Sequence, residues 1–409
     1  MNHEIISLEA ITQFRSPVEE FSPYEWYKQK LEHEPVSYHE VTRTWNVFRY
    51  ADVKRVLSDY EHFSSVRERT TISAGADNDE GKHAGRIDFM TDPPEHRKSR
   101  ALLSAAFTPR SLKLWEPRIR QIVDGLLKDM QDAPTIDVVK DFTSALPTIV
   151  IADLLGVPST DRLLFQQWVY DLFLPLPQDH AEDVNERKRN AATAYYSYLL
   201  PHVMHKRTHL TDDIISDLIQ AEVDGERLTD DEIVRMTMFI LGAGIETTSH
   251  LLANTFYAFL YDKPEIYGEV RAQRGLLPNT VEEMLRYRFH IAKMDRTVKQ
   301  DNELLGVPVK KGDVVVAWMS AANMDEAVFA NPFTLDIHRA NNKQHLTFGN
   351  GPHFCLGAPL ARLEANLGIG LFMDHYSKIE PVAGYKFEDH LSPSAAGQML
   401  TSLPIHVTR

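Results

Sequence analysis

Apolar residues recur at helical spacing over much of the chain. Between Thr108 and Met130 they fall three and four residues apart, behind a threonine N-cap and a proline at the first helical position. A similar start lies at Ser22, with Pro23 as the first helical residue and Glu25 as the acid of a capping box. Both stretches are predicted to form amphipathic helices.

The longest helical pattern begins at Thr229. Thr229 and Glu232 have the spacing of a capping box, and Leu228 and Ile233 are placed for a hydrophobic staple. Helix-compatible residues then continue for about eight turns. The sequence therefore predicts one long helix in the middle of the chain.

Patterns that indicate strands are fewer. Two polar stretches without periodicity, 67–86 and 177–190, are expected to be mobile surface segments that flank a site. No repeat or low-complexity linker divides the chain, so we predict a single, mainly α domain over residues 1–409 with small β-sheets. The expected strands lie within residues 44–50, 295–300, 311–320 and 403–407.

Composition narrows the functional classes. The chain carries 44 Lys and Arg against 58 Asp and Glu, and its net charge of -14 argues against nucleic-acid binding and against adsorption to an anionic membrane. The first residues lack an export or transit pattern, and the apolar runs are shorter than the ~20 residues that cross a bilayer. We expect a cytoplasmic protein without a membrane anchor or a nucleic-acid partner.

The single cysteine, Cys355, stands in the segment HLTFGNGPHFCLG. One cysteine excludes an intrachain disulfide, so the residue is an inert core thiol, a nucleophile or a metal ligand. A helix is predicted directly after it, and the N–H groups at a helix start favour the thiolate. Gly349, Gly351 and Gly357 permit tight turns and the close approach of a flat or bulky ligand. This arrangement suits a metal-bound thiolate.

A nucleophilic cysteine is the competing interpretation, with His353 as its base. Side chains two residues apart usually point apart in an extended loop, and no third group that would orient the histidine is evident. The pattern therefore favours a ligand over a nucleophile.

Polar residues interrupt the apolar sequence of the long helix at Glu246 and Thr247, beyond Gly242 and Gly244. Burying a carboxyl and a hydroxyl is costly unless they have partners or a function. A threonine bonded back to its own helix and a glutamate reaching solvent would explain the pair without a function.

A second polar pair lies at Glu283 and Arg286, one helical turn apart. Such a pair is usually a weak surface contact, and Glu283 could also complete a capping box with Thr280. Spacing alone leaves both interpretations open.

The cysteine segment resembles the haem-binding loop of the cytochrome P450 monooxygenases, and other motifs extend the resemblance over most of the chain. It implies the fold of that family and heme b with Cys355 as axial thiolate and metal ligand. AGIETT, residues 243–248, is similar to the oxygen-activation motif, which implies that Glu246 and Thr247 relay protons. Small departures are Met324, where the family has an arginine, and a missing proline after the EEMLR segment. The expected cofactor contacts are His96, Arg100, Ala243, Gly244, Arg296, Phe348, Gly349, His353, Cys355 and Gly357.

The same resemblance implies roles for two groups of charged residues. Glu283 and Arg286 are expected to bind Arg339 in a buried network that braces the haem loop. Two haem propionates need cationic partners where they leave bulk water. The residues at the matching positions are His96, Arg100, Arg296 and His353.

The implied reaction is reductive activation of dioxygen and insertion of one oxygen atom into a C–H bond. A single cysteine cannot hold an iron–sulfur cluster, so electrons are expected from a ferredoxin-type donor with its NAD(P)H-dependent reductase. Similarity to soluble steroid and terpenoid hydroxylases of bacilli favours a bulky apolar substrate and a monomeric enzyme. A peroxide-driven hydroxylase and a non-catalytic haem-based ligand binder remain alternatives. The expected substrate-binding residues are Phe239, Ala243, Thr247, Ala292 and Ala395, and the expected donor-docking residues are Arg97, Lys98, Arg110, Lys113 and Arg362.

Overall fold

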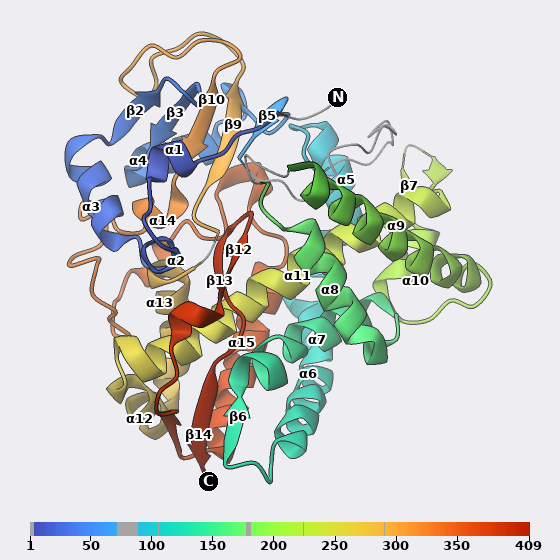
Figure 1. Ribbon diagram of the computed structural model, residues 1–409. Coiled ribbons are helices and arrows are strands. Elements are labelled where there is room, and N and C mark those ends of the chain that lie inside the picture. The colour runs from blue at the N-terminus through green and yellow to red at the C-terminus, as the bar shows by residue number, and fades with distance from the viewer. Residues whose placement is uncertain (1–3, 72–88, 105, 177–180, 224, 290) are drawn as a thin grey trace.

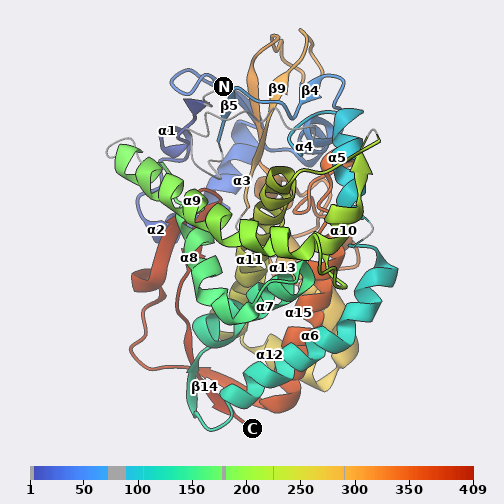
Figure 2. The same cartoon turned by 90° about the vertical axis from the view of Figure 1, so that its right-hand side faces the viewer.

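The computed structural model describes residues 4–71, 89–104, 106–176, 181–223, 225–289 and 291–409. Helices make up most of this part of the chain, and the largest sheet lies to one side with the N-terminal helices (Figures 1 and 2). The mainly α architecture with small sheets is the one predicted from the sequence. The α-helices are α1 (Glu9–Thr12), α2 (Pro17–Phe21), α3 (Tyr24–His33), α4 (Tyr50–Ser58), α5 (Glu95–Ser104), α6 (Pro109–Asp129), α7 (Ala145–Leu155), α8 (Arg162–Leu172), α9 (Ala181–Lys206), α10 (Ile214–Gln220), α11 (Asp230–Tyr257), α12 (Glu265–Ala272), α13 (Leu277–Tyr287), α14 (Met319–Ala322) and α15 (Ala358–His375).

The strands form small separate sheets. The largest has the order β2-β3-β10-β9-β4, in which β3 and β10 are parallel and the other neighbours are antiparallel. All four predicted strand regions contain a strand. The strands are β1 (Glu4–Ile5), β2 (Val36–His39), β3 (Thr44–Val47), β4 (Phe63–Ser64), β5 (Arg69–Thr70), β6 (Thr135–Asp137), β7 (Glu222–Val223), β8 (Glu226–Arg227), β9 (Met294–Val298), β10 (Val314–Ala317), β11 (Lys378–Pro381), β12 (Leu391–Ser394), β13 (Gly397–Leu400) and β14 (Pro404–Thr408).

The long helix α11 runs through the centre of the helical region (Figure 1). It packs against α7, α8, α9, α13 and α15, and most of its residues are buried. Gly244 permits the approach of α7, because a Cβ there would lie 3.1 Å from Cγ1 of Ile151. The central helix therefore has a fixed position against several neighbours.

Two of the three predicted helix starts are confirmed. The Thr108 side chain accepts a hydrogen bond from Ser111 N, and Thr229 and Glu232 form a reciprocal capping box at α11. The Ser22 prediction is wrong, because the short helix α2 ends at Phe21 and α3 starts after Pro23 without a side-chain cap. The Ser22 hydroxyl accepts a 2.9 Å hydrogen bond from Arg288 instead.

The predicted polar surface segments have mixed outcomes. Residues 72–88 and 177–180 lie outside the described residues, whereas Arg69–Thr70 form β5 and Thr70 and Thr71 are buried, so the prediction of a surface segment is wrong there. From Ala181 onward the second segment is helical, because Glu182 and Asp183 stand in the first turn of α9, where acidic side chains stabilise a helix. Lys188 of this helix is fully buried, so the prediction of a surface segment is wrong there.

Candidate active site

The loop before α15 holds Cys355 in a defined conformation. Gly349 and Gly351 have φ angles of 75° and 78°, which favour glycine. A Cβ on Gly351 would lie 2.6 Å from Cα of Ser58, so the loop is packed directly against the end of α4. Cys355 N donates a 2.8 Å hydrogen bond to Phe348 O, which closes the loop.

Cys355 lies at the start of α15, as predicted, and is exposed as a whole residue, although its sulfur is shielded from water by its surroundings. Burial of its surroundings raises the pKa of the Cys355 thiol, whereas the N–H groups of Gly357 and Ala358 and the charges of Arg100 and Arg362 lower it. The helix start therefore lowers the pKa of the thiol as expected, but desolvation is the larger effect and the net shift in the protein alone is upward. The same donors and positive charges stabilise a thiolate once its charge is shared with a metal.

Glu283, Arg286 and Arg339 form a buried ion cluster. Arg286 donates to both carboxylate oxygens of Glu283, at 2.9 and 2.7 Å, and Arg339 Nε donates to Glu283 Oε1 at 3.2 Å. Glu283 is fully buried, and Thr280 lies inside α13 with its hydroxyl bonded to Leu276 O. The surface-pair and capping-box interpretations of Glu283 are thus excluded.

The cluster is connected to the cysteine loop through Asn323. Arg286 Nη1 donates to Asn323 O at 2.9 Å and lies 3.6 Å from Sδ of Met324. The Asn323 amide in turn accepts from Leu346 N at 2.7 Å and donates to Thr347 Oγ1 at 2.9 Å. These contacts hold the residues that precede Phe348.

A second ion group, which sequence reasoning missed, supports the same loop. Arg362 and His345 both form hydrogen bonds with Glu282. Burial raises the pKa of Glu282, but these hydrogen bonds lower it further, so that the net pKa is about 2. The Arg362 guanidinium lies over the Phe348 ring at 4.6 Å. Glu282 stands beside Glu283 in the sequence, so one helical turn of α13 supplies both ion groups.

The predicted cationic residues gather near the thiol. The rings of His96 on α5 and His353 in the cysteine loop lie 3.9 Å apart. Burial and the charges of His96 and Arg296 lower the pKa of His353 to about 3. The positive charge of Arg100 is close enough to lower the pKa of the Cys355 thiol. Among the described residues His353 Nε2 has no hydrogen-bond partner although it is buried. A group of donors and positive charges with an unpaired buried nitrogen suits an anionic ligand.

One stretch of α11 borders open space. Ala243 is exposed and Thr247 is half-buried, although the surrounding turns of this helix are packed. The Thr247 hydroxyl donates to Ala243 O at 2.8 Å. Phe239, one turn earlier, is 43% exposed and stacks on Phe89. Three of the five predicted substrate residues therefore share this stretch.

Glu246 lies on the buried side of the same turn. Its Oε1 accepts a 2.6 Å hydrogen bond from Ser394, in the hairpin of β12 and β13, and lies 4.0 Å from Nε2 of the buried His250. Burial, partly offset by the Ser394 hydrogen bond, raises the pKa of Glu246 to about 7. A carboxyl with this pKa exchanges protons near neutral pH. The sequence did not single out Ser394, because a serine far along the chain carries no signal of its own.

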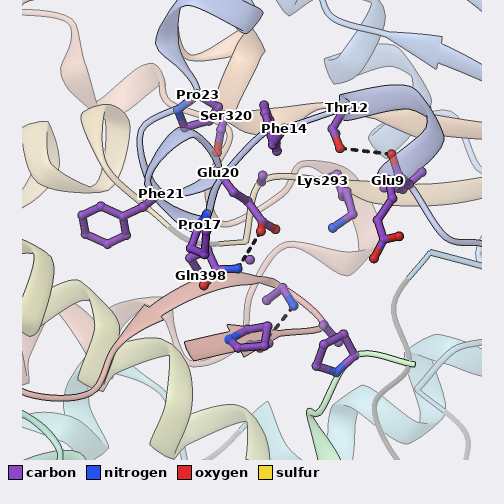
Figure 3. Close-up of a pocket in the computed structure, with 18 of the residues that line it drawn as sticks. Glu9, Thr12, Phe14, Pro17, Glu20, Phe21, Pro23, Lys293, Ser320 and Gln398 are labelled. Carbon is purple, nitrogen blue, oxygen red and sulfur yellow. Dashed lines mark hydrogen bonds between the residues drawn. The ribbon is translucent and has the colours of Figure 1, made fainter. Parts of the chain in front are cut away.

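A cavity of about 480 Å³ adjoins this region (Figure 3). Its wall includes Ala292 and Ala395, the other two predicted substrate residues, and Ser394. The volume lies within the roughly 300–1,000 Å³ of small-molecule sites. The cavity wall combines apolar residues with charged and polar ones, among them Glu9, Arg15, Glu20, Arg288, Lys293 and Gln398.

No helix in the described part of the chain has the length and hydropathy required to cross a membrane. Residues 10–408 match the sequence model of the family described as cytochrome P450. Cytochrome P450(MEG) of Priestia megaterium is 60% identical over 99% of both chains, and cytochrome P450(BM-1) of the same species is 58% identical over the full length of both. The crystal structure of CYP109E1 from Bacillus megaterium with testosterone has a TM-score of 0.87 and 35% identity, covering 96% of this chain and 99% of that one.

Proposed function

Since the chain belongs to the cytochrome P450 family of haem-thiolate monooxygenases, we propose that it hydroxylates a steroid or terpenoid with electrons from a ferredoxin and its reductase. The observation that carries this proposal is the arrangement on α11, where Ala243 and Thr247 border open space and Glu246 is buried directly behind them. This places a carboxyl of near-neutral pKa beside a hydroxyl at an accessible helix face.

The residues fit the cofactor of the family. When bound, haem supplies the activation of dioxygen and the insertion of oxygen into a C–H bond. Cys355 would hold the iron, and the loop glycines leave room for a flat macrocycle. The buried Nε2 atom of His353, which has no partner among the described residues, would donate to a propionate. His96, Arg100 and Arg296 would supply the remaining donors.

Glu246 and Thr247 would move protons to the reaction centre. The Thr247 hydroxyl is bonded to its own helix, and rotation about χ1 would turn it toward the accessible face. Glu246 is positioned by Ser394 and has a pKa that permits both uptake and release of a proton near pH 7. Gly244 lets this turn of α11 lie close to α7, because a Cβ there would lie 3.1 Å from Cγ1 of Ile151.

The ion groups on α13 would brace the cysteine loop. Glu283, Arg286 and Arg339 reach it through Asn323, and Glu282 reaches it through Arg362. A loop without regular structure needs such contacts to keep a metal ligand in a fixed position. Their proposed role is structural.

Several observations favour a bulky apolar substrate. Ala292 and Ala395 are small and line the cavity, and Ala243 leaves space at the accessible face of α11. The related CYP109E1 has been crystallised with testosterone and with corticosterone. Small residues around a large cavity leave room for a rigid polycycle.

The electron donor would dock on positive side chains near the cysteine loop. Arg97, Lys98 and Lys113 are exposed, and the Arg362 side chain is 30% exposed. The side chain of Arg110 lies outside the described residues. An acidic ferredoxin would be attracted to such a patch in spite of the negative total charge.

The experiment that tests the proposal compares product formation from a steroid panel under two conditions. One uses ferredoxin, reductase and reduced nicotinamide cofactor, and the other uses peroxide alone. We expect hydroxylated product with the electron donors and much less with peroxide, because Glu246 and Thr247 are both present. Product with peroxide alone would support the peroxide-driven alternative. Haem binding without product in either condition would support a ligand binder.

A further inference from the structure

Lys293 projects into the cavity and has no ion partner among the described residues. It lies between α13 and β9, and Figure 3 shows its side chain in the space beside Glu20. Its ammonium group makes no hydrogen bond or ion pair with any residue that the structure describes. Burial lowers the pKa of Lys293, and the charges of Glu20 and Asp295 oppose this effect. A partly desolvated ammonium group gains free energy from an acceptor oxygen.

Gln398 of β13 contributes a second unpaired group to the same cavity. Its amide nitrogen donates a 2.7 Å hydrogen bond to Glu20 Oε2, which fixes the orientation of the amide. Its Oε1 is buried and has no partner in the described part of the chain, and the whole residue is 9% exposed. A buried amide oxygen of this kind needs a donor.

The two groups have complementary requirements. The ammonium group of Lys293 needs an acceptor, and Oε1 of Gln398 needs a donor. A hydroxyl group supplies both, whereas a hydrocarbon supplies neither.

The cavity is joined to the reaction site by consecutive residues of one hairpin. Ser394 and Ala395 line the cavity, and Ser394 donates to Glu246 next to Thr247 on α11. A molecule in this cavity therefore extends along the wall that contacts the catalytic segment. Gln398 lies four residues beyond Ser394, on the paired strand β13.

We propose that Lys293 and Gln398 form a polar anchor that binds a hydroxyl group on the substrate, at the end remote from the carbon that is oxidised. The inference rests on the proposed function, and it narrows the substrate class to polycycles that carry such a hydroxyl. The anchor would fix the depth at which the substrate lies and hence the carbon that reaches the iron.

The test uses two ligands that differ by one ring hydroxyl, androstanol and androstane, with the haem-loaded protein. Dissociation constants are measured by equilibrium dialysis for wild type, Lys293→Met, Gln398→Leu and Lys310→Met. Lys310 is an exposed lysine paired with Asp301, which makes it a matched control for removal of a charge. The distribution of hydroxylated products is measured as a second readout.

For androstanol we expect about tenfold weaker binding to Lys293→Met and to Gln398→Leu, and a broader mixture of products. Androstane should bind wild type, both anchor variants and Lys310→Met with the same affinity. Equal weakening of both ligands, or no change for androstanol, would overturn the anchor while leaving hydroxylation of polycycles intact. A wild type that binds and oxidises neither compound would overturn the proposed substrate, and the anchor with it.

Discussion

The hydroxyl of Ser394 donates a 2.6 Å hydrogen bond to Oε1 of Glu246, across 148 positions of sequence. This contact connects the C-terminal hairpin, which lines the cavity, to the turn of α11 that carries the proposed proton relay. The cavity wall and the acid of the proposed relay therefore share one structural element.

Ser394→Ala should move the pH profile of turnover. The Ser394 hydrogen bond lowers the pKa of Glu246, which burial holds at about 7, so its removal should shift the corresponding inflection in kcat upward by about one pH unit. Glu246→Gln should abolish that inflection. Steady-state turnover across the pH range measures both. An unchanged inflection in Ser394→Ala, or one that persists in Glu246→Gln, would contradict this role.

Glu283→Gln should destabilise the protein by about 4 kcal/mol, because it leaves the buried guanidinium groups of Arg286 and Arg339 without their carboxylate. Urea unfolding of the haem-loaded protein measures the loss. Glu269→Gln is the control, since Glu269 pairs with the exposed His338 and should change stability by less than about 1 kcal/mol. Equal stability of the two variants would rule out the cluster as a brace.

Glu364 should make the free energy of unfolding depend on pH. This residue of α15 is 2% exposed, its Oε2 has no partner in the described residues, and burial raises the pKa of Glu364 to about 8. Between its unfolded pKa and about 8 the folded state binds more protons than the unfolded state, so stability falls as pH rises through this range. Glu364→Gln should therefore match wild type near about pH 5 and exceed it by about 4 kcal/mol near about pH 9.

Urea unfolding of the haem-loaded wild type and Glu364→Gln at the two pH values tests this pH dependence of stability. Glu326→Gln, a change of an exposed carboxylate, serves as the control and should show no such difference. If Glu364→Gln raised the free energy of unfolding by the same amount at both pH values, the charge of the carboxylate could not be the cause of the gain.

Reduction by an acidic ferredoxin should slow with increasing salt. The proposed docking patch of Arg97, Lys98, Lys113 and Arg362 would attract such a donor, and mobile ions would screen this attraction. Lys113→Glu should lower the second-order rate of haem reduction by roughly fivefold at low salt. Lys310→Glu removes an exposed lysine elsewhere and should have little effect. A rate that does not depend on ionic strength in stopped-flow measurements would exclude electrostatic docking.

Features carried by local patterns were predictable from the sequence. The capping box at Thr229, the N-cap at Thr108 and the helix after Cys355 follow from residue type and spacing. The Glu283 cluster was expected only through family resemblance, because an i,i+3 pair by itself does not indicate burial.

Features that depend on long-range packing were not predictable. Ser22 ends one helix instead of starting the next, because Arg288, far along the chain, takes its hydroxyl as an acceptor. Ser394, Lys293 and Gln398 come from short irregular or hairpin segments, and only the fold brings them to one cavity. The raised pKa of Cys355 likewise reflects desolvation, which outweighs the local effect of the helix start.

The central claim, that Cys355 is the thiolate ligand of a haem, is tested most directly by the absorption spectrum of the reduced protein under carbon monoxide. We predict the long-wavelength Soret band of a thiolate-bound carbonyl complex for wild type. Cys355→His should retain some haem, lose this band and lose hydroxylation. A colourless wild type, a spectrum typical of histidine ligation, or unchanged turnover in Cys355→His would contradict the assignment.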